Sequence, residues 1–449
     1  MVDKKKIRLN SSIKICLGFM LLILLGALLL SLPIANRNGE WLGFVDAFFT
    51  STSAVCVTGL VVVDTATQFT LFGQFVILFL IQIGGLGIVA ITSLVFLILR
   101  KKITLSSRMA LQESFNRENL QGVVKFIRRV IILTLAIEGI GALCLLYSTI
   151  TYFGSFWKGL FAAIFTSISA FCNAGFDVFG NELNQFMSLM PFASNILMLL
   201  PIMLLIVLGG IGFVVMIDGF KTWRSSHHAR IVIYVTLVLI LGGAILYMIA
   251  EWNNPLTIGK MPWWDKIFNC LFQSVATRTA GCASIDQGGL TPFGTLITIL
   301  LMFIGGSPTS TAGGIKTTTF FIIVLMLFKF PNSQGSIVYK GRKISANIIN
   351  KAFKIVMYTL TTVMVAILLI TLIEGDLDLM SIIFECVSAI STVGFSMGIT
   401  PMLSGASKII IALLMFVGRV GMTTIVLGLS TRSQVDNQVE YINTDIIVG

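Results

Sequence analysis

The sequence has 449 residues, of which 56% are hydrophobic and only 11% are charged, and its formal net charge is +11. Ordinary soluble domains carry about 25% charged residues, and a soluble fold cannot hide so much apolar surface. The composition therefore excludes a soluble globular protein. It predicts a protein whose partner is the lipid bilayer, and we expect no nucleic-acid partner.

Long apolar segments alternate with short ones along the chain. An α-helix needs about 20 apolar residues to cross the bilayer core, so segments near 14 residues suit re-entrant helices better than spans. The predicted spans cover 13–33, 70–99, 127–149, 192–217, 231–250, 292–326, 350–373 and 406–429. The predicted re-entrant helices cover 43–56, 158–172, 265–278 and 379–391. This alternation predicts an all-α membrane protein with eight transmembrane helices and four pore helices around a central pore.

The alternation also divides the chain into four repeats of the same orientation. We expect repeat 1 at 1–99, repeat 2 at 100–220, repeat 3 at 221–328, repeat 4 at 329–429, and a C-terminal tail at 430–449. Most of the 31 Lys and Arg residues fall in the termini and in the connections between repeats. Cytoplasmic loops carry such an excess, so both termini are predicted to be cytoplasmic in a multi-pass protein of the cell membrane. The opposite loops hold acids that would attract cations, namely Asp64, Asp177, Asp286 and Asp378.

Each short helix ends in a small polar stretch and a glycine. The four segments FFTSTSAVCVTGL, IFTSISAFCNAGF, CLFQSVATRTAGC and IFECVSAISTVGF align without gaps on Gly59, Gly175, Gly281 and Gly394. A helix C-terminus carries partial negative charge, glycine accepts positive φ, and extended carbonyls can replace the hydration shell of a cation. The pattern predicts a selectivity filter that holds K⁺ at backbone carbonyls of Val57, Thr58, Gly59, Asn173, Ala174, Gly175, Thr279, Ala280, Gly281, Thr392, Val393 and Gly394. The alternative is that each glycine forms an ordinary turn after a buried helix.

The second spans share a glycine motif at 84–87, 209–212, 305–308 and 418–421, where small residues permit close helix packing. The third copy continues as GGSPTSTAGGIK, a composition that breaks a helix, and we predict an intramembrane gate at 305–316. Arg419 and Lys316 are predicted to border the cavity under the filter and to limit cation passage, with backbone carbonyls or Glu138 as alternative partners. Arg278 is predicted to brace the filter. The predicted gate residues are Gly305, Gly306, Ser307, Pro308, Thr309, Ser310, Thr311, Ala312, Gly313, Gly314, Lys316 and Arg419.

The sequence contains few residues that could support catalysis or metal binding. The two histidines, His227 and His228, are adjacent in a basic segment, and the seven cysteines form no CxxC pair. We therefore expect no enzyme activity, no metal centre and no cofactor in this chain. Two alternatives remain to be weighed. A sodium-coupled secondary transporter would have inverted repeats, and an intramembrane hydrolase would need a nucleophile and a base within its spans.

These features resemble the Trk/Ktr/HKT superfamily of potassium-translocating membrane proteins, most closely the bacterial Ktr membrane subunit. The resemblance rests on one filter glycine per repeat, on SPTSTAGGIK at 307–316, and on VGRVG at 417–421. It implies potassium uptake that can depend on sodium, a homodimer with a pore in each subunit, and control by a cytosolic RCK (KTN) ring that binds a nucleotide. Contact with that ring is expected at 100–108, 340–354 and 430–449. In plant relatives a serine in the first repeat accompanies sodium transport, so Gly59 favours potassium.

Overall fold

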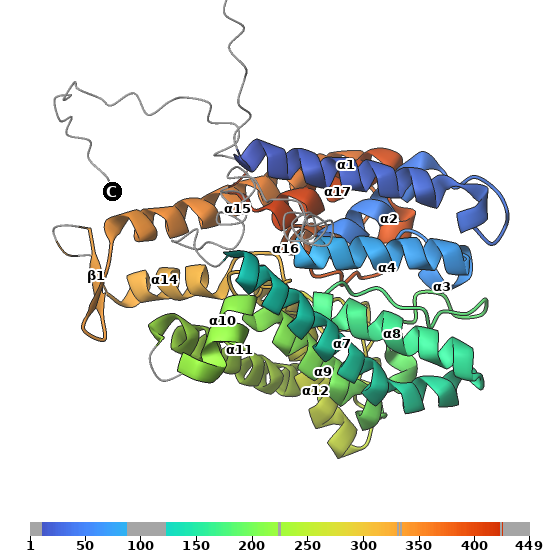
Figure 1. Ribbon diagram of the computed structural model, residues 1–449, viewed down its shortest axis with the longest axis horizontal. Coiled ribbons are helices and arrows are strands. Elements are labelled where there is room, and N and C mark those ends of the chain that lie inside the picture. The colour runs from blue at the N-terminus through green and yellow to red at the C-terminus, as the bar shows by residue number, and fades with distance from the viewer. Residues whose placement is uncertain are drawn as a thin grey trace, which may run out of the picture.

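The computed structural model describes residues 11–87, 123–222, 226–329, 332, 335–422 and 424. In this part of the chain the regular elements are helices, apart from one two-stranded hairpin (Figure 1). The predicted all-α class is thus confirmed at this level. The expected ring contacts at 100–108 and 430–449 lie outside the described residues.

Four helices of the described chain are long and apolar enough to cross a membrane. Each begins one of the predicted repeats, and each exposes large apolar side chains such as Leu21, Leu143, Leu241 and Leu368, all more than half exposed. Such an apolar exterior suits contact with lipid and not with water. The helices are α1 (Ser11–Ser31), α7 (Val123–Phe153), α11 (His227–Glu251) and α15 (Ala346–Ile373).

Short helices follow each long helix at the positions that the sequence predicts. They are α2 (Phe44–Cys56), α8 (Phe156–Cys172), α12 (Trp263–Ala276) and α16 (Leu379–Ser391). Each packs on the long helix before it, and the last turns of all four are buried. The side chain of Asp378 caps α16 by accepting a hydrogen bond from the Ser381 N–H, which satisfies one of the free amides at that helix start.

The predicted second spans at 70–99, 192–217, 292–326 and 406–429 are interrupted within the chain that the structure describes. The helices that begin them are α4 (Leu71–Leu86), α9 (Ile196–Ile211), α13 (Pro292–Phe303) and α17 (Gly405–Val420). Gly87, Gly212 and Gly421 follow three of them with φ of 86°, 99° and 88°. A residue in this left-handed region ends an α-helix, and glycine adopts it without steric cost. Residues 88–99 lie outside the described chain.

The remaining elements are short or follow these breaks. Helix α10 (Phe213–Thr222) comes directly after α9, and α14 (Thr317–Phe328) comes after the loop that ends α13. The predicted break of the third span is therefore present. Strands β1 (Ile337–Tyr339) and β2 (Arg342–Ile344) form an antiparallel hairpin. Four single turns complete the list: η1 (Pro33–Ala35), α3 (Thr65–Gln68), η2 (Met190–Phe192) and η3 (Thr400–Met402).

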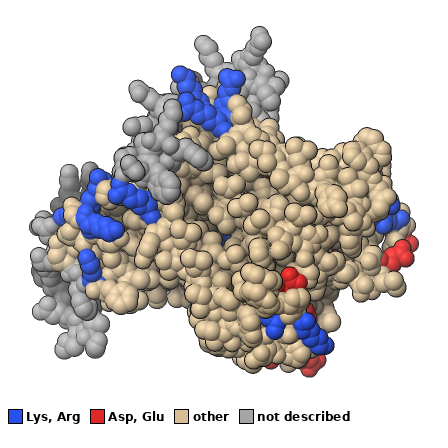
Figure 2. All heavy atoms as spheres, turned by 90° about the horizontal axis from the view of Figure 1, so that it is seen from below, with Lys and Arg blue, Asp and Glu red and all other residues tan. Residues whose placement is uncertain are grey.

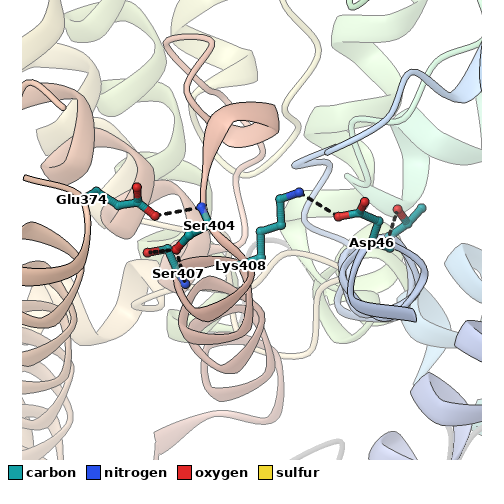
Figure 3. A network of polar contacts seen from close by, with 6 residues as sticks. Asp46, Glu374, Ser404, Ser407 and Lys408 are labelled. Atoms are coloured by element: carbon teal, nitrogen blue, oxygen red, sulfur yellow. Dashed lines mark hydrogen bonds and ion pairs between the residues drawn. The ribbon is translucent and has the colours of Figure 1, made fainter. Parts of the chain in front are cut away.

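Helices of successive units pack on one another in a closed cycle. Helix α4 contacts α8, α9 contacts α12, α13 contacts α16, and α17 contacts α2. The last contact brings the end of the described chain back to its beginning. An ion pair of 2.7 Å between Lys408 Nζ of α17 and Asp46 Oδ1 of α2 closes it (Figure 3). Close by, Glu374 Oε1 accepts a hydrogen bond of 2.8 Å from the Ser404 N–H, and its pKa is lowered by the hydrogen bonds that it accepts.

Charge is distributed unevenly over the surface. Figure 2 shows several Lys and Arg toward the end of the molecule that carries the hairpin, where no Asp or Glu is visible, whereas the visible Asp and Glu lie toward the other end beside further Lys and Arg. The exposed basic side chains of the hairpin and of the α15 start are Lys340, Arg342, Lys343, Lys351 and Lys354. Most of the molecular surface between the two ends is uncharged (Figure 2), as expected of a surface that faces lipid.

Candidate functional site

The four aligned glycines meet in one ring. A Cβ atom built on Gly59 would lie 2.5 Å from the Ala174 oxygen, one on Gly175 would lie 2.8 Å from the Ala280 oxygen, and one on Gly281 would lie 2.5 Å from the Val393 oxygen. A Cβ on Gly394 would collide with the Thr58 oxygen, which closes the ring in chain order. Since no side chain fits at any of these positions, the ring admits only glycine. Each strand also presents a carbonyl oxygen to the next.

The backbone before each glycine has an unusual conformation that repeats in all four strands. The residues two positions before the glycines have positive φ: Val57 57°, Asn173 59°, Thr279 81° and Thr392 50°. The glycines themselves have φ of 93°, 71°, 66° and 94° in the same order. Positive φ is uncommon outside glycine and is unfavourable for a β-branched residue such as Val or Thr. The surrounding structure therefore has to hold these strands in place.

Serine side chains supply part of that support, and sequence reasoning missed them. Ser53 Oγ accepts a hydrogen bond of 3.0 Å from the Gly59 N–H, and Ser388 Oγ accepts one of 3.1 Å from the Gly394 N–H. In the second copy, Ser169 Oγ donates to the Phe176 oxygen at 2.7 Å. All three serines stand six residues before their glycine, so the alignment contained the signal. The third copy has Val275 there.

The glycines of the second-span motifs pack against the C-terminal ends of the short helices. Cβ atoms built on Gly84, Gly209 and Gly418 would collide with the carbonyl oxygens of Val55, Phe171 and Ile390, which lie in or next to the last turns of α2, α8 and α16. Glycine is required because these helices approach the short-helix backbones directly. The third copy differs, since Gly305 lies against the Gly313 carbonyl of its own loop.

A cavity of about 280 Å³ opens on one side of the ring, and all four glycines line it. The carboxyl groups of Asp64, Asp177 and Asp286 line it too, whereas Asp378 does not. Asp64 Oδ1 accepts a hydrogen bond of 3.1 Å from the Phe186 N–H. Burial raises the pKa of Asp177 in this loop to about 7, an effect that the Phe179 N–H opposes and the Asp64 carboxylate reinforces.

The loop between α13 and α14 lies against residues that precede the ring glycines in the second and fourth strands. Its neck is held by a hydrogen bond of 2.9 Å from the Gly305 N–H to the Ile315 oxygen. Its tip bonds to the end of α9, where the Ser307 N–H donates to the Gly210 oxygen at 2.9 Å. A Cβ on Gly313 would collide with Thr392 Oγ1, so the loop touches the fourth strand directly. The predicted filter and gate segments are thus adjacent in space.

The two basic residues of this region bind carbonyls. Arg419 donates through Nη1 to the Thr311 oxygen of the loop and through Nη2 to the oxygens of Gly84 and Gly85, the latter at 3.0 Å. Lys316 Nζ donates to the Ala312 oxygen at 2.6 Å. Of the two alternatives set out above, carbonyls are therefore the partners. A cation near the C-terminal carbonyls of α4 is also favourable for the helix dipole.

The other two candidate charges lie outside the ring. Glu138 of α7 is buried and accepts a hydrogen bond of 3.1 Å from Gln82 Nε2, so it joins α4 to α7. Arg278 is buried behind the third strand, and its Nη1 donates to the Thr236 oxygen of α11 at 3.5 Å. That contact joins Arg278 to α11, and its bracing role stays a prediction.

The chain is thus an apolar helical protein in which four glycines meet in one ring, each against the carbonyl oxygen of a neighbouring strand. The family model for TrkH, described as a cation transport protein, matches residues 19–441. The chain therefore belongs to the TrkH family of cation transport proteins. Its relatives are transporters and not enzymes, and with its apolar helices the chain is a multi-pass membrane protein.

Individual relatives cover the whole chain. It is 38% identical to the potassium/sodium uptake protein NtpJ of Enterococcus hirae over 100% of both chains. It is also 38% identical to the Ktr system potassium uptake protein B of Bacillus subtilis, over 99% of this chain and 98% of the relative. The crystal structure of the potassium transporter TrkH from Vibrio parahaemolyticus shares the fold, with a TM-score of 0.74 and 17% identity over 96% of this chain and 86% of that one.

Proposed function

We propose that this chain is the ion-translocating subunit of a potassium uptake system and conducts K⁺ through the glycine ring. One observation carries the proposal: four strands from four parts of the chain meet at Gly59, Gly175, Gly281 and Gly394, each with a carbonyl oxygen against the next. Such carbonyls can replace the water around a cation that has lost its hydration shell. The filter would consist of the twelve residues predicted above, with K⁺ as cargo and no resident cofactor.

The descriptions of the relatives support potassium as the transported ion. Proteins that this chain resembles over nearly their full length are described as potassium or potassium/sodium uptake proteins. Gly59 agrees with a preference for potassium. No strand reads TVGYG, so discrimination against sodium is expected to be weaker than in tetrameric potassium channels.

The four units would be four parallel copies of span, pore helix and span, in which glycines interrupt the second span. The cyclic contacts from α4 to α8 through to α17 and α2 support this arrangement. Parallel copies argue against a secondary transporter of the inverted-repeat type. The basic hairpin end would face the cytoplasm, since positive charge gathers there, and with it both termini.

The loop at 305–316 would act as the gate. It contacts the second and fourth strands, and Arg419 joins it to the end of α4. The loop is held by hydrogen bonds, such as those from the Ser307 N–H to the Gly210 oxygen and from Arg419 to the Thr311 oxygen, so its displacement would require these bonds to break. Lys316 and Arg419 would add positive charge that opposes cation passage until the loop is displaced.

A regulatory partner would control that gate. Similarity to Ktr system proteins supports a membrane subunit that works with a separate partner. We expect a homodimer and a cytosolic RCK (KTN) ring that carries the nucleotide. In the described chain, the exposed basic hairpin and α15 start within 340–354 are the surface available for this contact.

Uptake of rubidium and sodium into proteoliposomes by the purified chain tests the filter. Wild type should prefer rubidium, and Gly59→Ser and Gly281→Ser should lower the preference, because each added Cβ collides with a neighbouring carbonyl. A filter in which neither glycine matters would contradict the proposal and reopen the transporter alternative. Deleting part of 305–316 should raise flux in a protein that still folds.

A further inference from the structure

Polar side chains of two short helices bond to residues in the wall of the cavity that opens on the ring. In α16, Glu385 Oε1 accepts a hydrogen bond from Thr400 Oγ1. In α12, the amide groups of Gln273 and Gln287 exchange two hydrogen bonds, of 2.6 Å and 3.2 Å. All four side chains are buried. Thr400 and Gln287 also line the cavity, so each link joins a short helix to the cavity wall.

The two links occupy the same place in the third and fourth units. Thr400 stands six residues after Gly394, and Gln287 stands six residues after Gly281. Both links therefore hold the chain that leaves the ring on the side of the cavity. In the other half of the wall a loop residue has this task, since Asp64 accepts a hydrogen bond of 3.1 Å from the Phe186 N–H.

Glu385 is unfavourable for stability at its position. It is only 1% exposed, and its Oε2 has no hydrogen-bond partner within the described residues. A buried carboxyl group with an unsatisfied oxygen destabilises a fold, and a well-packed apolar side chain in its place is often neutral or stabilising. Removing Glu385 would not leave the Thr400 hydroxyl alone, because Thr400 Oγ1 also bonds to Ser396 Oγ at 2.9 Å. Folding alone therefore does not account for a glutamate here.

The segment that Glu385 holds forms part of the cavity wall next to the fourth strand. Ser396, Met397, Gly398 and Thr400 all line the cavity. Ser388 stands one helical turn after Glu385, and its Oγ accepts the hydrogen bond from the Gly394 N–H. One face of α16 thus holds both the ring glycine and the segment that follows it. A wall that is already ordered binds an ion with a smaller loss of conformational freedom than a loose one.

We propose that Glu385 is a positioning residue for cation entry, whose hydrogen bond to Thr400 fixes the cavity wall after the fourth strand and so sets the affinity for the approaching cation. Gln273 has the same role in the third unit through Gln287. This inference rests on the filter proposed above. Glu385 acts through Thr400 and does not touch the ion. The link therefore affects the cation concentration at which uptake is half-maximal, and not the maximal rate, which the ring and the gate determine.

Glu385→Leu tests the link, because it removes the hydrogen bond together with the unsatisfied oxygen. The rubidium concentration for half-maximal uptake into proteoliposomes should rise by about two- to tenfold, the range that one ordinary hydrogen bond represents. The maximal rate and the thermal unfolding temperature in detergent without rubidium should not fall. A residue with a purely structural role would instead lower both. Glu182→Leu is the matched control, since Glu182 is exposed and does not line the cavity.

Conservative variants separate the hydrogen bond from the negative charge. Glu385→Gln keeps an acceptor oxygen for Thr400 and should keep the wild-type half-maximal concentration. Thr400→Val should raise that concentration as Glu385→Leu does, whereas Thr400→Ser keeps the hydroxyl and should not. The double variant of Glu385→Leu and Thr400→Val should show no further rise, because both changes remove the same bond. If Glu385→Leu does not fold, the two Thr400 variants decide.

The outcomes distinguish this inference from the filter. If Glu385→Leu and Thr400→Val keep the wild-type half-maximal concentration while Gly281→Ser alters the rubidium-to-sodium ratio, the filter stands and the positioning role is wrong. It is also wrong if Glu385→Gln matches Glu385→Leu, since the charge would then matter and not the link. If Gly281→Ser leaves the ratio unchanged, the filter fails first and binding decides. Equal rubidium concentrations for half-maximal thermal stabilisation of wild type and Glu385→Leu would then overturn the inference.

Discussion

Replacing Arg419 by alanine should release the loop. The guanidinium makes one hydrogen bond to the loop, at the Thr311 oxygen, and two to the end of α4. A hydrogen bond from a charged donor contributes about 1.5–3 kcal/mol, so losing the one to Thr311 should favour the displaced loop by about 10- to 150-fold. Initial rubidium uptake by Arg419→Ala should rise accordingly, until the filter itself limits the rate.

Arg419→Ala also removes a positive charge beside the pathway, and Arg419→Lys separates the two effects. Lysine keeps the charge but lacks the planar fork that reaches two sets of carbonyls at once. If hydrogen bonding holds the loop, Arg419→Lys should also raise uptake; if charge alone opposes cations, it should match wild type. Arg230→Ala, at an exposed position in the first turn of α11, is the matched control. A folded Arg419→Ala protein with wild-type or lower flux would refute the idea that Arg419 holds the loop in place.

Three further outcomes follow from the same geometry. Gly394→Ala should lower rubidium selectivity by roughly five- to 150-fold in uptake, the equivalent of about 1–3 kcal/mol of overpacking against the Thr58 carbonyl. With a pKa of about 7, Asp177 becomes charged as external pH rises through that value; rubidium uptake from dilute solution should rise over the same interval, and Asp177→Asn should flatten the profile. Lys408→Met should lower the free energy of unfolding by about 1 kcal/mol or less, since its side chain is 13% exposed and that of Asp46 is 31%; thermal unfolding with Asp46→Asn and the double variant measures the coupling.

Sequence reasoning succeeded where the signal is local. The helix predicted at 379–391 is present as Leu379–Ser391, and the one predicted at 43–56 is present as Phe44–Cys56. Their lengths and apolar character are properties of a single segment, and the glycine that follows each is visible in the alignment. The four glycines were predicted to share one register, and they meet in one ring.

It failed where conformation is decided by a neighbour or by one dihedral angle. Hydropathy continues past Gly87, Gly212 and Gly421, so it did not predict the interruptions there, although positive φ ends each of the helices α4, α9 and α17. The bonds from Arg419 to Thr311 and from Asn173 to Thr311 join residues more than a hundred positions apart. No local pattern encodes such a pairing, because its energy depends on the fold that brings the partners together.

The third unit differs from the other three in how its second span packs. In the other units a glycine of the second span packs on a carbonyl at the end of the short helix, and a serine bonds the strand or the loop just beyond it. The third unit has Val275 in place of the serine, and Gly305 packs on its own loop instead. Its second span is therefore not tied to α12 at that point, and the chain freed there forms the loop. All four units contribute a glycine and a carbonyl oxygen to the ring, and the third unit also supplies the loop that contacts the second and fourth strands, which is the asymmetry that the proposed gate would require.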